Sequence, residues 1–194
     1  DTYGIFASFD YEMSDKWTLS IGGRYTNEEK DVFWRASSYP EYAQNERLTL
    51  AAALLPNKAA KEWSSFDPKV TLTYNLENSG IIYATYSTGF KSGGYNAPTR
   101  QGGEALEPEE IMMIELGYKA DLTDRLRLTS SFFMYDYEDL QVTRAAVGTG
   151  TVTTENAADS EVMGADFDLT WLVSDSLTLR FGGEILDAEY EDFE

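Results

Sequence analysis

Apolar and polar residues alternate with a period of two along much of this chain. Residues 17–27 show the pattern clearly, because Trp17, Leu19 and Ile21 alternate with Thr18 and Ser20. The same alternation returns in residues 69–76, 114–122, 164–171 and 177–184. A period of two is that of a β-strand whose two faces meet different surroundings. The pattern therefore predicts an all-β fold.

The predicted strands are long. They lie near residues 3–12, 17–27, 65–76, 81–90, 111–122, 126–142, 157–173 and 177–190. A tilted strand needs about 9–11 residues to cross a bilayer, whereas the strands of soluble proteins most often have about five or six. Aromatic residues such as Trp17, Tyr25 and Trp171 stand near the ends of apolar faces, as they do in interfacial girdles. A soluble β-sandwich also alternates, so it stays an alternative on this pattern alone.

The connections between these strands alternate in length. Short polar turns at residues 13–16, 77–80, 123–125 and 174–176 alternate with long links at residues 28–64, 91–110 and 143–156. Short turns on one side and long loops on the other are typical of outer-membrane barrels. The sequence therefore predicts a transmembrane antiparallel up-and-down β-barrel, with all short turns on one side and all long links on the other.

The alternation also predicts which side chains face lipid, because the hydrocarbon core offers no partner to a charge or hydroxyl. We expect Leu19, Ile21, Leu72, Leu116, Phe167 and Leu179 to face outward, and Ser20, Thr71, Glu115, Asp166 and Arg180 to face inward. Residues 132–137 carry aromatics on both faces, and no outward face can be assigned there.

Composition removes several function classes. The formal net charge is −19, with 34 acidic against 15 basic residues, which argues against phosphate-backbone binding. The chain has no His and no Cys, so it has no Ser-His-Asp triad, no Cys-His pair, no thiolate metal site and no His-ligated metal. No apolar run approaches the roughly 20 residues of a membrane helix. We expect no enzyme, catalytic residue, metal or cofactor, and we interpret the acidic residues 187–194 as a solvated rim rather than a Ca²⁺ site.

Five segments carry a family resemblance, and they occur along the chain in the family's order. They are Gly23-Arg24-Tyr25-Thr26-Asn27 with the residues up to Asp31, Phe66-Asp67-Pro68-Lys69-Val70, residues 83–96 (Tyr83-Ala84-Thr85-Tyr86 through Gly93-Gly94-Tyr95-Asn96), Glu107-Pro108-Glu109 with Glu115-Leu116-Gly117-Tyr118-Lys119, and Asn156-Ala157-Ala158 with Gly164. Together they resemble the barrel of TonB-dependent receptors, the energised importers of the outer membrane.

The resemblance implies that residues 1–194 are part of a barrel of about 22 strands, without the family's N-terminal plug. It implies uptake of a scarce ligand in the outer membrane of a Gram-negative bacterium, by default a ferric siderophore, with cobalamin, haem or glycan as other ligands. The implied partners are outer-membrane lipid, the small-molecule ligand and an inner-membrane energy-coupling complex reached through the plug, and no nucleic acid. In a larger barrel, residues 3–12 and 177–190 would not pair with each other. The alternative is a small closed eight-stranded barrel that acts as an anchor or adhesin.

Aromatic residues and arginines in the long links are candidates for ligand binding, because stacking and charge can hold an aromatic or anionic iron chelate. The candidates are Trp34, Tyr39, Tyr42, Trp63, Tyr95 and Arg100. The same side chains could instead pack the loops, and residues 48–63 could form a short helix. Arg24 and Arg180 would face the lumen, either to contact a passing ligand or to pair with a carboxylate such as Glu184.

Overall fold

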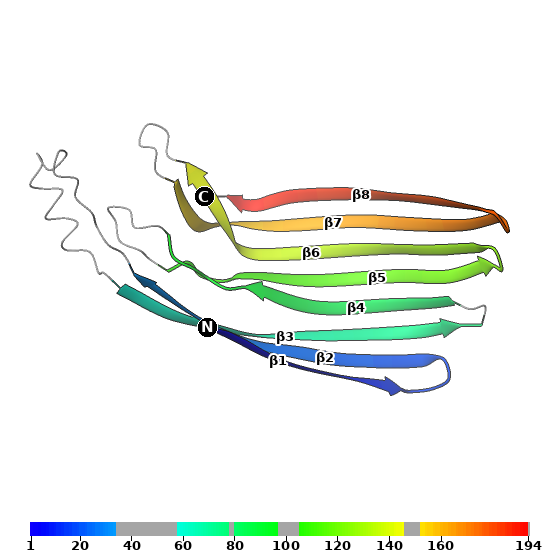
Figure 1. The fold of residues 1–194 in the computed structure, drawn as a ribbon, viewed down its shortest axis with the longest axis horizontal. Helices are drawn as coiled ribbons and strands as arrows, with labels where there is room; N and C mark the ends of the chain where they lie inside the picture. The colour runs from blue at the N-terminus through cyan, green and yellow to red at the C-terminus, as the bar shows by residue number, and fades with distance from the viewer. Residues whose placement is uncertain (34–57, 78–79, 97–104, 146–151, 194) are drawn as a thin grey trace, which may run out of the picture.

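The computed structural model describes residues 1–33, 58–77, 80–96, 105–145 and 152–193. In these residues, eight strands form one antiparallel sheet in which each strand pairs with its neighbours in sequence (Figure 1). The strands are β1 (Thr2–Glu12), β2 (Trp17–Phe33), β3 (Lys58–Leu76), β4 (Gly80–Lys91), β5 (Glu109–Thr123), β6 (Leu126–Ala145), β7 (Val152–Ser174) and β8 (Leu177–Phe193). Within the described ranges, no helix has the length and apolar character needed to cross a membrane. The predicted up-and-down all-β fold is confirmed.

The short turns all lie at one end of the sheet, at the right in Figure 1, and the strands lead into the long links at the other end. This arrangement confirms the predicted topology. Two of the turns are joined by the Lys16–Glu77 ion pair, in which Nζ and Oε1 are 2.7 Å apart. The hydrogen bond to Glu77 raises the pKa of the exposed Lys16 ammonium.

Two neighbouring rows of paired residues show how the sheet separates its faces, because residues paired across strands point to the same side. One row runs across all eight strands through Tyr11, Leu19, Leu72, Ala84, Leu116, Phe132, Ala165 and Ile185. The next row runs through Asp10, Ser20, Thr71, Thr85, Glu115, Phe133, Gly164 and Leu186. The first row belongs to an apolar face and the second to a mainly polar face. Every residue predicted to face outward or inward lies on the corresponding face.

Aromatic pairs mark both ends of the apolar face. Trp17 and Tyr74 lie with ring centroids 4.7 Å apart near the short turns, and Tyr3 and Tyr25 lie 6.5 Å apart toward the long links. The eight residue steps from Trp17 to Tyr25 span roughly 26 Å along the strand, the order of the apolar band of outer-membrane barrels. Leu116, between these ends, is 54% exposed although it lies in mid-sheet. The described residues leave this part of the apolar face exposed.

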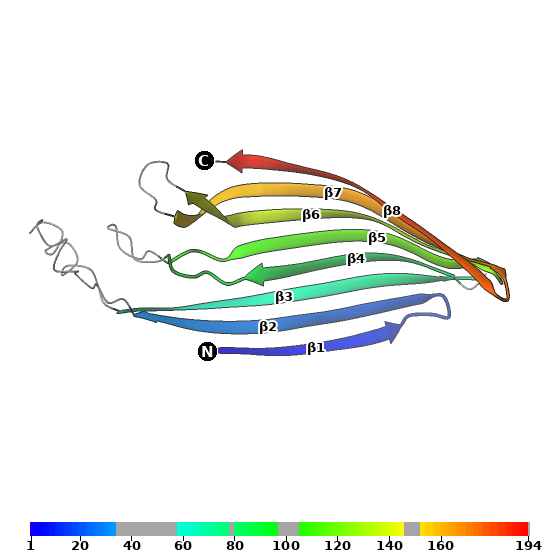
Figure 2. The same cartoon turned by 45° about the horizontal axis from the view of Figure 1, so that its top comes forward.

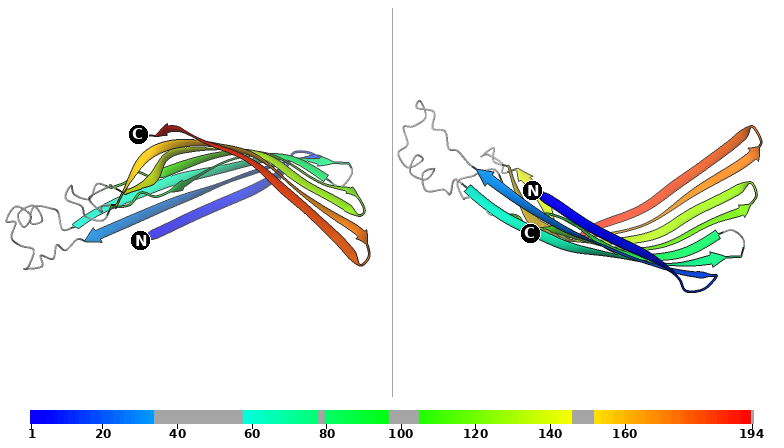
Figure 3. Two further views of the ribbon diagram at one scale, coloured as in Figure 1. Left: turned by 90° about the horizontal axis from the view of Figure 1, so that it is seen from above. Right: turned by 60° about the horizontal axis from the view of Figure 1, so that its bottom comes forward.

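Several side chains on the polar face are buried. Thr26, Trp63, Thr85, Phe133 and Ser160 are buried, and all five point to this side. The sheet is twisted and curved, with β1 and β8 at its opposite edges (Figures 2 and 3). In the described residues β1 and β8 do not pair with each other, as predicted for part of a larger barrel.

Several strands extend beyond the predicted bounds on the long-link side. β2 continues to Phe33, β3 begins at Lys58 and β7 begins at Val152. A short helix was predicted as one alternative within residues 48–63. That prediction is wrong for residues 58–63, which belong to β3, while residues 48–57 lie outside the described residues. Above the apolar band both faces of a strand can meet water, so the alternation that identifies a strand fades there.

Candidate ligand-facing wall and rim

Hydrogen bonds between side chains of neighbouring strands tie the polar face together. The Thr71 and Thr85 hydroxyl oxygens lie 2.9 Å apart. Tyr83 donates its hydroxyl to Glu115 Oε1 at 2.5 Å, and Ser131 donates to Asp166 Oδ2 at 2.6 Å. These bonds fix the orientation of hydroxyl and carboxylate groups on the wall.

An aromatic ladder interrupts this polar wall on β6. Phe133, Tyr135 and Tyr137 follow one another on the inward side, with ring centroids 5.1 Å and 6.5 Å apart. The ladder explains the aromatics on both faces of residues 132–137, since Phe132 and Met134 point to the apolar side.

Glycines on neighbouring strands leave room for these inward rings. A Cβ at Gly164 would lie 2.5 Å from Phe133 Cζ, and a Cβ at Gly117 would lie 2.1 Å from Tyr83 Cζ. Gly117 and Gly164 both belong to the family-like segments. They are therefore sites where an aromatic side chain covers a neighbouring strand.

At the rim, the first and last residues of the connection from β4 to β5 lie side by side and extend the β4–β5 hairpin. We name its described residues 91–96 and 105–109 the rim strap. Tyr95 and Ala105 form an antiparallel bridge, and Leu106 N–H donates to the Gly94 carbonyl at 2.8 Å.

On one side the rim strap is held by β2 and β3. Lys30 Nζ donates to the Gly93 carbonyl at 2.7 Å and to Ser92 Oγ at 2.8 Å. The same ammonium, with Ser92, lowers the pKa of Glu28, which lies on β2 beyond the apolar band. Lys61 pairs with Glu107 at 2.7 Å.

Trp63 is the centre of this attachment. It is only 4% exposed, and its ring lies 5.6 Å from Lys30 Nζ and 5.4 Å from Lys61 Nζ. Tyr95 meets it edge-on with centroids 6.0 Å apart. A Cβ at Gly93 would lie 2.5 Å from Trp63 Nε1, so the glycine lets the strap approach the indole.

On the other side the rim strap is held by β6 and β7 through amide side chains. Asn96 exchanges two bonds of 2.6 Å with the Thr154 backbone. Asn156 Nδ2 donates to the Glu107 carbonyl at 2.9 Å and to the Asp139 carbonyl at 2.7 Å, while Glu107 N–H donates to Asn156 Oδ1 at 3.0 Å. Asp139 has a φ of 56°, a left-handed conformation that Asp tolerates better than most residues, at a register shift in β6.

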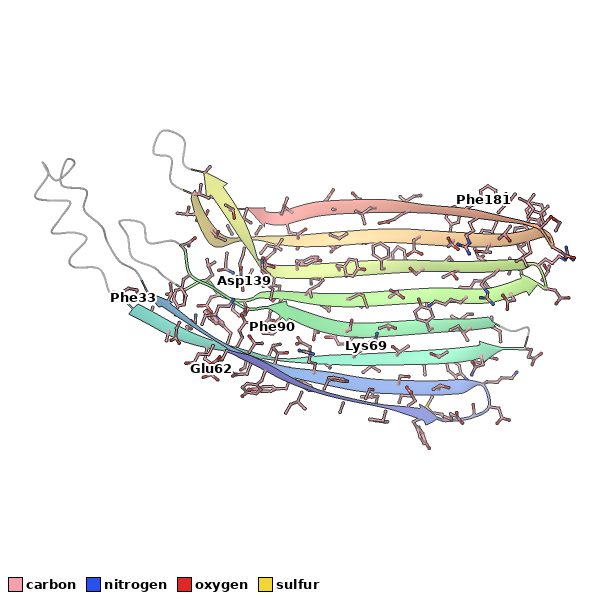
Figure 4. The ribbon with its side chains drawn as sticks, in the orientation of Figure 1. Phe33, Glu62, Lys69, Phe90, Asp139 and Phe181 are labelled. Carbon is pink, nitrogen blue, oxygen red and sulfur yellow. The ribbon has the colours of Figure 1, made fainter. Side chains whose placement is uncertain are left out.

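Below the strap, β3 and β4 separate. Their pairing stops at Lys69 and Ser87, although β3 begins at Lys58 and β4 continues to Lys91. Pro68, the next residue of β3, has no N–H to donate to a ladder. We name the unpaired stretch above Lys69 and Ser87 the β3–β4 seam; Figure 4 labels Lys69 and Phe90 on its two strands.

A groove lies beside the seam on each face of the sheet. One of about 690 Å³ is lined mostly by side chains of the polar face, including Arg24, Lys69 and Ser87. Another of about 560 Å³ is lined largely from the apolar side, by residues such as Phe66, Tyr86 and Met112.

The predicted ligand residues divide into two sets. Trp34, Tyr39, Tyr42 and Arg100 lie outside the described residues. Trp63 and Tyr95 are brought into contact, although Trp63 lies in β3 rather than in a loop. Sequence reasoning missed Lys69 and Asn156 as site residues, although both stand in the family-like segments.

Arg24 and Arg180 were expected either to contact a ligand or to pair with a carboxylate. In the described residues neither forms an ion pair. Arg24 Nε donates instead to Thr26 Oγ1 at 2.9 Å. In the same part of the chain, no group of three or more acidic side chains is placed to hold a metal ion.

A sequence model described as TonB-dependent receptor-like β-barrel matches residues 1–192. The chain belongs to this family. Among curated proteins it is 25% identical over 197 residues to the probable TonB-dependent siderophore receptor PiuA of Acinetobacter baumannii, covering 97% of this chain and 24% of that protein. The chain therefore spans about a quarter of the length of this relative.

Solved structures of TonB-dependent receptors share the fold. The ferric yersiniabactin uptake receptor FyuA of Yersinia pestis superimposes with a TM-score of 0.80 at 16% identity, over 99% of this chain and 28% of that one. The siderophore receptor PiuA of Acinetobacter baumannii superimposes with a TM-score of 0.71 at 20% identity, over 99% and 26%. These relatives are receptors and not enzymes, and the sheet described above is a partial barrel.

Proposed function

We propose that this chain forms part of the barrel wall of a TonB-dependent receptor in the outer membrane of a Gram-negative bacterium. The receptor takes up a scarce ligand, by default a ferric siderophore, by energised transport. One observation carries the proposal: across all eight strands of the described sheet, one face is apolar and exposed and the other is mainly polar. Lipid covers the first face, and the second lines the path of the ligand.

The rim supports a receptor function for this wall. The rim strap is bonded to β2–β3 and to β6–β7, so it holds the ends of separate long links in fixed relation. We propose Trp34, Tyr39, Tyr42, Trp63, Tyr95 and Arg100 as ligand-binding residues at these links. Energy reaches the receptor from an inner-membrane complex through a plug outside this sequence.

The siderophore default follows the named relatives, since PiuA and FyuA are called siderophore and ferric yersiniabactin receptors. The alternative, a small closed barrel, requires β1 to pair with β8, and the sheet order has them at opposite edges.

Growth on single iron sources tests the function. A strain from which the whole receptor gene is deleted should lose growth on one ferric siderophore and keep growth on ferrous iron, and a plasmid copy should restore it. Unchanged growth on every ferric chelate, haem and cobalamin source would contradict the proposal.

A further inference from the structure

The β3–β4 seam is bounded at both of its ends. Toward the short turns, the last paired residues are Lys69 and Ser87. Toward the rim, the two chains meet again at Trp63, which precedes Lys69 by six residues, and Gly93, which follows Ser87 by six residues. A Cβ at Gly93 would lie 2.5 Å from Trp63 Nε1, and Trp63 is only 4% exposed. The seam is therefore an interruption of the ladder that the rim strap closes at its outer end.

The grooves on the two faces of the sheet meet at this seam. The lumenal groove has a volume of about 690 Å³, and the groove on the apolar side has a volume of about 560 Å³. The lining residues that the two grooves share are Asp67, Pro68, Thr88 and Gly89. Since no ladder pairing joins β3 to β4 at these four residues, the seam connects the lumenal side of the wall with its outer side.

The seam reaches into the apolar band. Phe66 on β3 pairs with Tyr25, which belongs to the aromatic pair at the outer end of this band. Lys69 lies three residues nearer to the short turns, so the inner end of the seam lies within the band. At that depth an unpaired strand edge is tolerated only where protein or a water-filled cavity meets it. Water in the lumenal groove can meet the backbone groups of the seam.

The outer groove has an exposed apolar lining. Phe66, Tyr86 and Met112 line it, and all three point to the apolar side of the sheet. Phe66 is 66% exposed and Tyr86 is 41% exposed. A hydrocarbon chain suits such a surface, because it has no polar group that would need a partner there.

Acidic side chains border the same groove and disfavour a resident phospholipid as its occupant. Glu110, Asp136 and Glu138 line the groove, and Glu110 lies directly opposite Glu138. Within the described residues none of the three forms an ion pair. These carboxylates would repel the anionic phosphate of a membrane lipid. A hydrocarbon chain that enters from the lumen carries no phosphate past them.

We propose that the β3–β4 seam holds the linear acyl tail of an amphiphilic ligand. The polar head of the ligand stays in the lumen, and the tail passes between β3 and β4 to the outer groove. The proposal rests on the proposed uptake function and deepens it, because it assigns an acylated chelate as the transported ligand.

Photo-labelling of the full-length receptor in lipid nanodiscs tests the seam with two defined probes. One is a neutral ferric trihydroxamate that carries a dodecanoyl tail with a diazirine at its end, and the other carries the diazirine on a two-carbon linker. The tailed probe should label the peptides that contain Tyr86 and Met112 and spare the peptide that contains Leu179, which lies on the apolar face away from the groove. An excess of the tailed chelate without diazirine should suppress this labelling, and the short probe should not produce it.

Two pairs of variants locate the tail. Thr88→Trp fills the seam and should lower labelling of the Met112 peptide about tenfold, the effect of withdrawing roughly two methylene groups from the groove. Ala84→Trp, on the same face of β4 but outside the groove, should leave that labelling unchanged.

Met112→Gln removes part of the apolar lining and should lower labelling of the Tyr86 peptide. Met113→Gln, on the opposite face of β5, should not. The heat-modifiable band of the receptor reports the fold of each variant, and the Met112 and Met113 variants decide the test if Thr88→Trp does not fold.

Three results would overturn the proposal. They are equal labelling of the Met112 and Leu179 peptides, labelling that stays on lumenal residues, and unchanged labelling in folded Thr88→Trp and Met112→Gln receptors. Labelling of the Met112 peptide by a diazirine phospholipid that the tailed chelate does not displace would also overturn it, by assigning the groove to membrane lipid. Failure of the uptake function is read separately, from growth of the deletion strain.

Discussion

Single glycines decide how closely the rim and the wall can pack. Gly93 and Gly94 are neighbours in sequence, but a Cβ at Gly93 would lie 1.9 Å from the Leu106 carbonyl oxygen, whereas one at Gly94 would meet nothing within 4 Å. The sequence shows only a glycine pair in a long link. The enclosure of Gly93 depends on Trp63 and Leu106, which arrive from other parts of the chain, so no local pattern could reveal it.

This difference gives a matched test on one residue type. Gly93→Ala should destabilise the full receptor by about 1–3 kcal/mol, because a backbone oxygen must move to admit the methyl group. Gly94→Ala should have little effect. Urea unfolding in detergent would measure both, and equal stability of the two variants would contradict the packing of the rim strap against Trp63.

Strands show most clearly what a sequence can predict. Between the aromatic ends the lipid requirement imposes a strict period of two, and every assigned face there agrees with the sheet. Beyond Tyr25 on β2, and before Trp63 on β3, the pairing continues but the apolar period does not. The inward aromatics of β6 blurred the pattern for a different reason, because Phe133 and Tyr135 cover the wall rather than meet lipid.

Two leucines of nearly equal exposure, one on each face of the sheet, allow a matched test of which face meets lipid. Leu116 is 54% exposed on the apolar face, and Leu186 is 55% exposed on the polar face. In the full receptor, Leu116→Arg should cost about 2–4 kcal/mol, the price of a cation facing lipid near the midplane, while Leu186→Arg should be tolerated. Folding yield into lipid vesicles would measure both; a greater loss for Leu186→Arg would reverse our assignment of the faces.

At the scale of the whole sheet, the described residues leave both edge strands, β1 and β8, without an outer partner. β1 pairs only with β2 and β8 only with β7 in the described residues, and an unpaired edge in lipid leaves backbone groups unsatisfied at several kcal/mol each. Repeated hairpins in the family's order made this partial barrel predictable from the sequence. The groove at the β3–β4 seam was not predictable, because it arises where two strands that are consecutive in sequence stop pairing.

Folding of the isolated 194-residue chain therefore tests the central claim, that this sheet is part of a larger barrel. In detergent or lipid vesicles, the full receptor should migrate as a compact, heat-modifiable band on a semi-native gel. The isolated chain should give no such band, since its edge strands have no partners. A heat-resistant monomer of the isolated chain, with a disulfide forming between cysteines placed on β1 and β8, would show closure of these eight strands and contradict the account.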